Sequence, residues 1–342
     1  MRRFLVSGGA GFIGSNFVRY LLNAHPDYQV TVLDKLTYAG NLDNLLDVQD
    51  NPRYHFIKGD ICDPSVVGAI HESPERPHVV VNFAAESHVD RSLLDPGSFL
   101  RTDVQGTYVL LEAARAHGVE LFVQISTDEV YGSIQEGSFR ETDPLSPSSP
   151  YAASKAGADL LALAYHTSFE LPVVITRSSN NFGPYQYPEK FIPLFITNAI
   201  DGEPLPLYGD GLQVRDWLYV LDNCRAIDLV IHQGVPGEVY NVGASSERVN
   251  LEVAGSIVRL LVAPRDLIRH VTDRPGHDRR YSLDSSKLRS LGWAPSRTHE
   301  EALEETVRWY VDNQWWWRKI KSGEFLDYYR RNYGERLQQF SP

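Results

Sequence analysis

The stretch FLVSGGAGFIG, residues 4–14, decides the fold of this chain. A short apolar run comes first, and glycines then stand at positions 8, 11 and 14 before a helical pattern begins. Gly8 permits a tight turn, Gly11 lets the backbone approach a pyrophosphate, and Gly14 allows close packing of helix on strand. The free N–H groups of the helix start would bind phosphate oxygens. This order of strand, turn and helix predicts a dinucleotide site, and a purely structural glycine turn is the alternative.

An acidic residue at the end of the next strand indicates which dinucleotide binds. Asp34 closes the apolar run 29–33 and lies 20 residues after Gly14. A carboxylate at this point binds a ribose 2′-hydroxyl and repels a 2′-phosphate. We therefore expect NAD as the cofactor and not NADP.

The first half of the chain alternates between strands and helices. Strand-like apolar runs are separated by helix-length segments, a pattern typical of a parallel sheet covered on both faces. The connections should be right-handed crossovers. Strands are expected at residues 3–6, 29–33, 54–58, 78–83, 121–126 and 173–177, with helices at 13–24, 106–117 and 152–169 among others.

Beyond residue 180 the pattern becomes irregular, because five prolines between positions 184 and 206 interrupt it. We therefore predict an α/β protein with a Rossmann-type, doubly wound parallel sheet and a smaller, mixed α/β C-terminal lobe for the substrate. The cofactor domain is expected to cover residues 1–179, with return segments at about 212–240. Residues 180–342 are expected mainly to form the second lobe.

Composition narrows the class of protein further. No apolar run reaches the roughly 18 residues that cross a bilayer, so we expect no membrane partner and a cytoplasmic location. The net charge of −11 argues against nucleic acid as a partner. Cys62 and Cys224 have no metal-ligand partner at short spacing, so we expect two buried thiols and no metal, with a disulfide as the alternative.

Tyr151 and Lys155 form a candidate catalytic pair after the fifth strand. Their spacing of four places both on one face of the helix that starts there. A tyrosine base must lower its pKa from near 10 towards neutrality, and a neighbouring ammonium or a nicotinamide cation would favour this. Tyr54 and Lys58 have the same spacing but lie in an expected strand, where a structural role is favoured.

The fifth strand ends in a polar triplet, Thr127, Asp128 and Glu129. Ligands of open α/β sheets bind at the carboxyl ends of the strands, so these side chains should face the same cleft as Tyr151. Two adjacent carboxylates can divide their roles between general acid and general base. A solvated loop or a helix cap is the alternative interpretation.

Together these residues resemble the extended short-chain dehydrogenase/reductases and, among them, the dTDP-glucose 4,6-dehydratases. The resemblance rests on SGGAGFIG, Asp34, STDEVYG at 126–132 and YAASK at 151–155, and it continues through the segments 177–184, 208–211 and 274–278. It therefore covers essentially the whole chain. Related sugar epimerases carry small or apolar residues at positions 128 and 129, so the acidic pair is its most diagnostic part.

The resemblance implies a reaction in three steps on one bound sugar nucleotide. Tyr151, assisted by Thr127 and Lys155, takes the proton of the 4-hydroxyl while hydride passes from carbon 4 to NAD. Glu129 then removes the proton at carbon 5 while Asp128 protonates the departing 6-hydroxyl. Hydride finally returns to carbon 6, so that NAD is regenerated.

The resemblance also implies the binding residues. Cofactor contacts are expected from Gly8, Gly11, Phe12, Ile13, Gly14, Asp34, Lys35, Thr37, Asp60, Ile61, Phe83, Ala84, Ala85, Ser87, Thr102, Tyr151, Lys155 and Asn181. Substrate contacts are expected from Ser87, Thr127, Asn180, Lys190, Pro206, Tyr208, Arg215, Asn250, Arg274, His277 and Asp278. Arg215 and Arg274 would clamp the diphosphate, because a guanidinium meets phosphate oxygens in a bidentate manner; a surface salt bridge is the alternative for each. Asp60 would flank the adenine, with a turn or helix-cap role as the alternative.

The resemblance also implies the partners, which are dTDP-glucose and a second copy of the chain, joined through the helices at 106–117 and 152–169. Two other functions remain open, an NAD-dependent sugar-nucleotide 4-epimerase and a non-catalytic NAD-binding protein of the same fold. The sequence also leaves open which pathway uses the product and how strictly thymidine is required.

Overall fold

A seven-stranded parallel sheet forms the centre of the molecule. The computed structural model describes residues 1–273 and 276–338. The strand order is β10-β6-β5-β4-β1-β2-β3. The strands are β1 (Arg2–Ser7), β2 (Tyr28–Asp34), β3 (Tyr54–Lys58), β4 (Val79–Asn82), β5 (Leu121–Thr127), β6 (Val173–Ser178) and β10 (Val239–Val242). The order reverses between β1 and β4, and this reversal opens a crevice at the carboxyl ends of the strands. The predicted Rossmann-type fold is confirmed.

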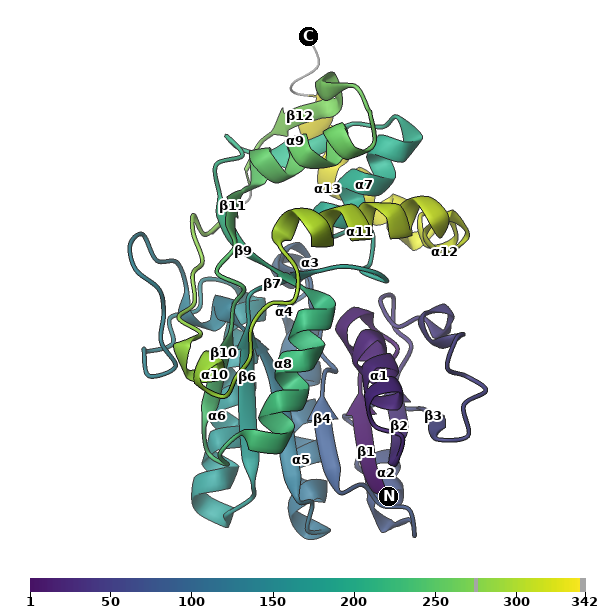
Figure 1. Ribbon diagram of the computed structural model, residues 1–342, viewed down its shortest axis with the longest axis vertical. Coiled ribbons are helices and arrows are strands. Elements are labelled where there is room, and N and C mark those ends of the chain that lie inside the picture. Colours follow the sequence, from purple (N-terminus) through teal and green to yellow (C-terminus); the bar gives the residue numbers. More distant parts are fainter. Residues whose placement is uncertain (274–275, 339–342) are drawn as a thin grey trace.

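Helices cover both faces of this sheet (Figure 1). One face carries α1 (Phe12–Ala24) and α8 (Val220–Gln233), and the other carries α2 (Pro64–Glu72), α5 (Thr107–Ala116) and α6 (Pro150–Phe169). Neighbouring side chains of a strand point to opposite faces. In β1, Phe4 and Val6 therefore pack with α1 and α8, whereas Leu5 packs with the other group. Burial on both faces explains why the strands are continuous apolar runs.

A second group of elements lies beyond the carboxyl ends of the strands and has its own core (Figure 1). Its strands pair in the orders β11-β9-β7 and β12-β8. They are β7 (Asn180–Phe182), β8 (Leu205–Tyr208), β9 (Val214–Tyr219), β11 (Glu247–Val249) and β12 (Ile268–Val271). The helices are α7 (Phe191–Asp201), α9 (Asn250–Leu260), α11 (His299–Asp312), α12 (Gln314–Ile320) and α13 (Glu324–Gln338). This is the predicted mixed α/β lobe.

Short helical segments connect the larger elements. They are η1 (Leu42–Leu45), α3 (Val89–Leu94), α4 (Pro96–Phe99), η2 (Leu100–Gly106), η3 (Asp128–Tyr131), η4 (Arg265–Leu267) and α10 (Ser286–Ser290). The segment η2 is a π-helix, and it leads directly into α5. It lies against the start of α6, where the predicted catalytic pair is placed.

The strands expected from the sequence all occur, with ends that differ by one residue at most. The edge strand β10 and the helix α8 come from residues 220–242, close to the expected return segments, while the exact domain limits stay a prediction. Both cysteines are buried and free, as expected. Within the described residues, no helix is long and apolar enough to span a membrane.

Candidate active site

A cavity of about 290 Å³ opens at the carboxyl ends of β1, β4 and β5, where the strand order reverses. The glycine turn, the loops after β2, β3 and β4, the segment after β5 and the start of α6 all contribute to its walls. All the residues predicted to bind the cofactor, and all five predicted catalytic residues, line this cavity. Segments far apart in the sequence thus meet in one place, and their individual roles stay predictions.

The glycine turn has the shape that a dinucleotide requires. Gly8 has a φ of +70°, and a Cβ on it would lie 2.6 Å from the backbone nitrogen of Ala84. A Cβ on Gly14 would lie 2.3 Å from the carbonyl oxygen of Gly8. Gly11 begins α1 without a side-chain cap, and the first turn of α1 holds no acidic residue. The N–H groups at this helix start therefore suit a phosphate, so the residues present fit NAD.

Asp34 links the glycine turn to β2. Its Oδ2 accepts a hydrogen bond from the Ala10 amide at 2.9 Å, and its Oδ1 accepts one from the Leu36 amide at 2.8 Å. Burial raises the pKa of Asp34 above its ordinary value. Each carboxylate oxygen retains a second lone pair, so a ribose hydroxyl could still donate to it. Asp34 thus holds the turn in place and also lines the cavity.

Asp60 has the turn role that was the alternative interpretation, while its role beside the adenine stays a prediction. Its Oδ1 accepts from the Cys62 amide at 2.9 Å, as in a turn, and its Oδ2 lies 2.7 Å from the Lys35 Nζ. Burial acts to raise the pKa of Asp60, but the bonds from Lys35 and Cys62 outweigh it and hold this pKa below the ordinary value. Asp60 and Lys35 both line the cavity.

Tyr151 and Lys155 are held at the start of α6. The Ser149 hydroxyl caps this helix by accepting from the Ala152 amide at 3.1 Å, and Pro150 occupies its first turn. The buried Lys155 ammonium donates to the Ile125 carbonyl oxygen of β5 at 2.6 Å. The helix cap and this bond fix the pair against the end of the strand.

The pKa of Tyr151 differs from the sequence expectation. Burial raises it well above its ordinary value, the negative charges of Glu129 and Asp103 raise it further, and a hydrogen bond with Thr127 lowers it. The surrounding carboxylates therefore oppose ionisation of the tyrosine. The positive charge of an oxidised nicotinamide would be needed to bring the pKa of Tyr151 down.

Asp128 has the environment of a proton donor. Its side chain is buried, and burial raises its pKa well above the ordinary value; the charge of Glu129 adds to this effect, while Arg215 opposes it. Its Oδ1 accepts from the Thr127 hydroxyl at 3.2 Å, and Oδ2 has no hydrogen-bond partner among the described residues. This environment favours the protonated carboxyl, as a general acid requires.

The triplet also serves as the cap that the alternative interpretation proposed. The Thr127 hydroxyl accepts from the Glu129 amide at 3.3 Å and so caps η3. Both carboxyl groups nevertheless line the cavity beside Tyr151. The local structural role therefore fixes the side chains without removing them from the site.

A buried network of hydrogen bonds holds the segment η3, which contains Asp128 and Glu129, in place against the sheet. The Arg177 Nε donates to Asp159 at 2.9 Å, and the same Asp159 oxygen accepts from the Ser126 hydroxyl at 2.9 Å. Arg177 Nη1 also donates to the Tyr131 hydroxyl at 2.8 Å, and Tyr131 donates to Asn241 at 2.9 Å. The ends of β5, β6 and β10 and the segment η3 are thereby joined.

Asp103 is a buried carboxylate near the site that sequence reasoning missed. Its Oδ2 accepts from the Ser154 hydroxyl at 2.6 Å and its Oδ1 from the Glu86 amide at 3.0 Å. Burial raises its pKa to about 6, against the influence of Lys155. Asp103 lies on η2, in a stretch without a motif, so no sequence signal could have found it. It positions α6, and its charge raises the pKa of Tyr151.

Loop residues 186, 187 and 189 also line the cavity and were missed. Glu189 is buried and forms an ion pair with Arg91 at 2.9 Å. The Arg91 guanidinium lies over the rings of Tyr38 and Tyr328, at 3.9 and 4.4 Å. A proline-rich loop gives no period from which its packing could be predicted.

Four of the predicted substrate residues line the cavity, namely Ser87, Thr127, Asn180 and Lys190. The Lys190 ammonium donates to the Ser87 carbonyl oxygen, which joins two of them. The side-chain oxygens of Asn180 and Asn181 are buried and have no hydrogen-bond partner within the described residues. They are acceptors for which a bound ligand would supply donors.

The other predicted substrate residues lie outside the lining of this cavity. Arg215 of β9 packs over the Tyr281 ring at 4.3 Å and donates to the Asp278 carbonyl at 2.9 Å. The rings of Tyr208 and His277 meet edge to face, with their centroids 5.9 Å apart. The group that the cavity does not include is Pro206, Tyr208, Arg215, Asn250, His277 and Asp278. Arg274 falls outside the described residues, and the roles of all seven stay predictions.

The sheet, the glycine turn and the Tyr–Lys pair define a class: a dinucleotide-dependent enzyme of the extended short-chain dehydrogenase/reductase type. The profile of the family "GDP-mannose 4,6 dehydratase" matches residues 5–306. The chain therefore belongs to this family of nucleotide-sugar dehydratases, and the predicted resemblance is confirmed.

Individual relatives define the similarity more narrowly. The chain is 54% identical to a dTDP-glucose 4,6-dehydratase of Streptomyces niveus over 325 residues, which cover 94% of this chain and 96% of that one. The crystal structure of DesIV, a dTDP-glucose 4,6-dehydratase from Streptomyces venezuelae with NAD bound, is 52% identical with a TM-score of 0.90, covering 93% of this chain and 100% of that one. The NAD complex of a Thermus thermophilus UDP-glucose 4-epimerase is 33% identical with a TM-score of 0.84, covering 91% and 99%.

Proposed function

We propose that this chain is an NAD-dependent hydro-lyase that converts dTDP-glucose into dTDP-4-keto-6-deoxyglucose. The observation that carries the proposal is the meeting of Asp128 and Glu129 with Tyr151 and Lys155 in one cavity. Elimination of water needs an acid and a base besides the tyrosine that serves the redox steps. The greater identity to dehydratases than to the epimerase supports the same conclusion.

The proposed catalytic roles belong to residues that line the same cavity. Bound NAD would supply the hydride acceptor for carbon 4 and the hydride donor for carbon 6. Tyr151 takes the proton of the 4-hydroxyl, with Thr127 hydrogen-bonded to it and Lys155 held on β5. The buried, protonated Asp128 gives its proton to the departing 6-hydroxyl, so that water leaves. Glu129 removes the proton at carbon 5 and later returns it there.

The binding roles divide between the two parts of the chain. Residues 1–179, with the return segments at about 212–240, hold the cofactor through the glycine turn and Asp34. Residues 180–342 mainly bind the sugar nucleotide, with Arg215 and Arg274 at the diphosphate. The unpartnered oxygens of Asn180 and Asn181 support ligand contacts where the two parts meet at the cavity.

A 4-epimerase is the second candidate, because a structural neighbour at 33% identity carries that name. Epimerisation uses the tyrosine and the cofactor but requires no acid and base for elimination. A buried carboxyl with a raised pKa would have no task in it, which favours the dehydratase.

The purified chain is expected to remove one water from dTDP-glucose without added NAD, since the cofactor is regenerated within each turnover. Mass spectrometry of the nucleotide sugar checks this. A panel of other nucleoside diphosphate glucoses, run alongside, measures how strictly thymidine is required. Conversion of dTDP-glucose to an isomer of the same mass, detected by NMR, would show that the chain is an epimerase instead.

We also propose that the chain forms a homodimer through α5 and α6. These helices leave apolar side chains exposed, with Tyr108 at 47%, Leu160 at 58% and Phe169 at 50%. Light scattering is expected to give the mass of two chains, and Leu160→Glu should give that of one. The matched control Leu260→Glu changes an exposed leucine of α9 and should leave the dimer intact. A monomeric wild-type chain would contradict the proposal.

A further inference from the structure

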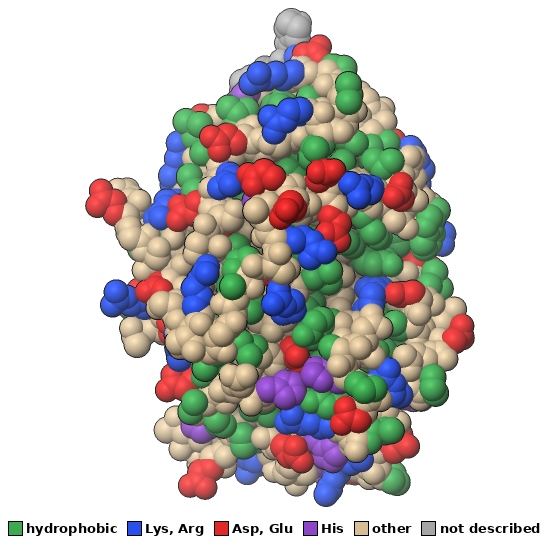
Figure 2. Space-filling view, viewed as in Figure 1, with side chains coloured by type: hydrophobic (Ala, Val, Ile, Leu, Met, Phe, Trp, Pro, Cys, Tyr) green, Lys and Arg blue, Asp and Glu red, His purple; other side chains and the backbone are tan. Residues whose placement is uncertain are grey.

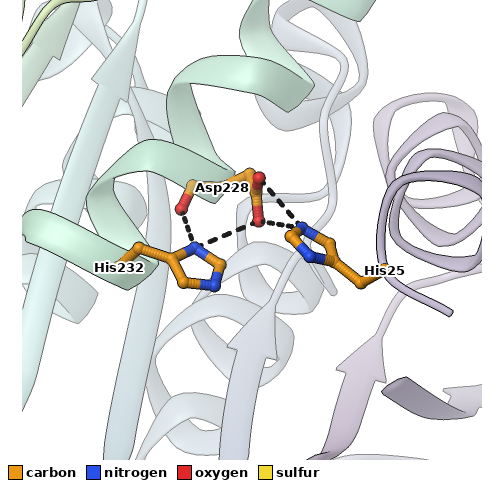
Figure 3. A group of neighbouring side chains, drawn as sticks. All are labelled: His25, Asp228 and His232. Carbon is orange, nitrogen blue, oxygen red and sulfur yellow. Dashed lines mark hydrogen bonds and ion pairs between the residues drawn. The ribbon is translucent and has the colours of Figure 1, made fainter. Parts of the chain in front are cut away.

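Two histidines and an aspartate come together at the opposite end of the central sheet from the cavity. His25 follows α1, while Asp228 and His232 lie one turn apart on α8 (Figure 3). Figure 2 shows histidine side chains at the surface between these two helices. Tyr28, which begins β2, borders the cluster, so it lies at the amino end of the strands. None of the three residues lines the cavity.

The potential ligand atoms of the cluster are already close together. His25 Nε2 lies 3.0 and 3.1 Å from the two carboxylate oxygens of Asp228, and His232 Nδ1 lies 3.3 Å from Oδ1. One ligand atom from each residue lies within 4.8 Å of the other two. Nitrogen and oxygen ligands of a tetrahedral zinc ion lie about 3.3 Å apart. A metal ion would therefore need only small movements of these side chains.

Neighbouring tyrosines orient the cluster. The Tyr20 hydroxyl donates to Asp228 Oδ2 at 3.1 Å, and the Tyr28 hydroxyl lies 2.6 Å from His232 Nε2. His232 Nδ1 also lies 2.7 Å from the backbone carbonyl oxygen of Asp228, so this nitrogen is the hydrogen-bond donor here. To coordinate a metal, Nδ1 would give up this bond and the proton would move to Nε2, where Tyr28 would accept it. The His25 ring stacks on Tyr28, with centroids 4.3 Å apart. Hydrogen bonds and packing of this kind hold ligands in place around metal sites in proteins.

We propose that His25, Asp228 and His232 bind a divalent transition metal ion of the zinc type, with water at the remaining position. Two imidazoles and one carboxylate suit zinc and its neighbours in the first transition series, and they do not suit magnesium or calcium. His25 and Asp228 are 203 residues apart in the chain and lie at the end of α1 and within α8. The ion would therefore join the end of α1 to α8 and would stabilise the folded chain. It has no part in the reaction.

The test uses the full chain without a polyhistidine tag, treated with chelator and then titrated with zinc chloride in a calorimeter. One zinc ion is expected to bind each chain and to raise the Tm. His25→Gln and His232→Gln should each weaken binding by at least about tenfold, because even residues around the ligands contribute that much. The matched control His55→Gln changes an exposed histidine of β3 and should bind as the wild type does.

Anomalous scattering at the zinc edge should place the ion between the three side chains. Dehydration of dTDP-glucose should remain unchanged in His25→Gln and His232→Gln, which separates this proposal from the proposed function. Circular dichroism checks that the variants are folded. If a histidine variant is not folded, the variant Asp228→Asn is tested in its place. An absence of saturable binding would overturn the proposal, as would binding that both histidine variants retain in full.

Discussion

Replacing Asp128 by Asn and Glu129 by Gln together is expected to abolish the loss of water while the oxidation at carbon 4 continues. Each removed acid or base contributes about 10²–10⁴-fold to a proton transfer, so elimination should fall below detection. Tyr151 and Lys155 remain in place, and reduced NAD should therefore accumulate on the protein. Rapid-mixing absorbance measures the reduced NAD that forms. Mass spectrometry of the nucleotide sugar measures the loss of water.

The double variant should also affect the pH dependence of the first step. The charge of Glu129 raises the pKa of Tyr151, so removing that charge should lower this pKa. The rate of NAD reduction rises with pH as the tyrosine ionises, and this rise should occur at lower pH in the variant. Neutral replacement of a carboxyl that is already protonated should leave the fold intact.

A matched control for this experiment is Glu304→Gln with Asp312→Asn. Both carboxylates are exposed on α11, so the same chemical changes are made outside the cavity. The control should dehydrate dTDP-glucose at the wild-type rate. Full dehydration by the Asp128 and Glu129 variant would show that other groups perform the elimination.

The residues expected to bind the cofactor could be found in the sequence, and line one cavity, because their constraints are local; their contacts with NAD stay predictions. A Cβ on Gly8 or Gly14 would collide with backbone, so the glycines must appear in the sequence itself. Asp34 is recognisable because it closes a strand at a fixed distance from the turn. The helix period likewise brings Tyr151 and Lys155 together, and the end of β5 brings the acidic pair to them.

The parts that escaped prediction depend on contacts between distant segments. Asp103 reaches Ser154 across 51 residues, and nothing near it marks it as part of the site. Arg215 was expected to clamp the diphosphate, and this role stays a prediction; the contacts of its guanidinium with Tyr281 and the Asp278 carbonyl could not be read from the sequence. The spacing of Asp228 and His232 was visible, whereas His25 joins them only through the packing of α1 on α8. Strand and helix periods contain no information on such pairs.

Tyr151→Phe is expected to stop the reaction one step earlier than the acidic pair does. Without its hydroxyl, the group that takes the proton of the 4-hydroxyl is lost, and turnover should fall about 10²–10⁴-fold. The phenyl ring keeps its edge contact with Phe99, so the cofactor site should remain formed. Neither reduced NAD nor dehydrated sugar should appear, in contrast to the accumulation expected for the double variant.

A variant that combines Tyr151→Phe with the replacements of Asp128 and Glu129 shows which step comes first. A chain that carries Tyr151→Phe together with the Asp128 and Glu129 replacements should behave as Tyr151→Phe alone, because its block comes first. Tyr108→Phe, at an exposed tyrosine of α5, provides the control and should retain full activity. Rapid accumulation of reduced NAD in Tyr151→Phe would assign the first proton to another group. Glu129 would then be the next candidate, since its carboxylate lines the same cavity and its charge acts on Tyr151.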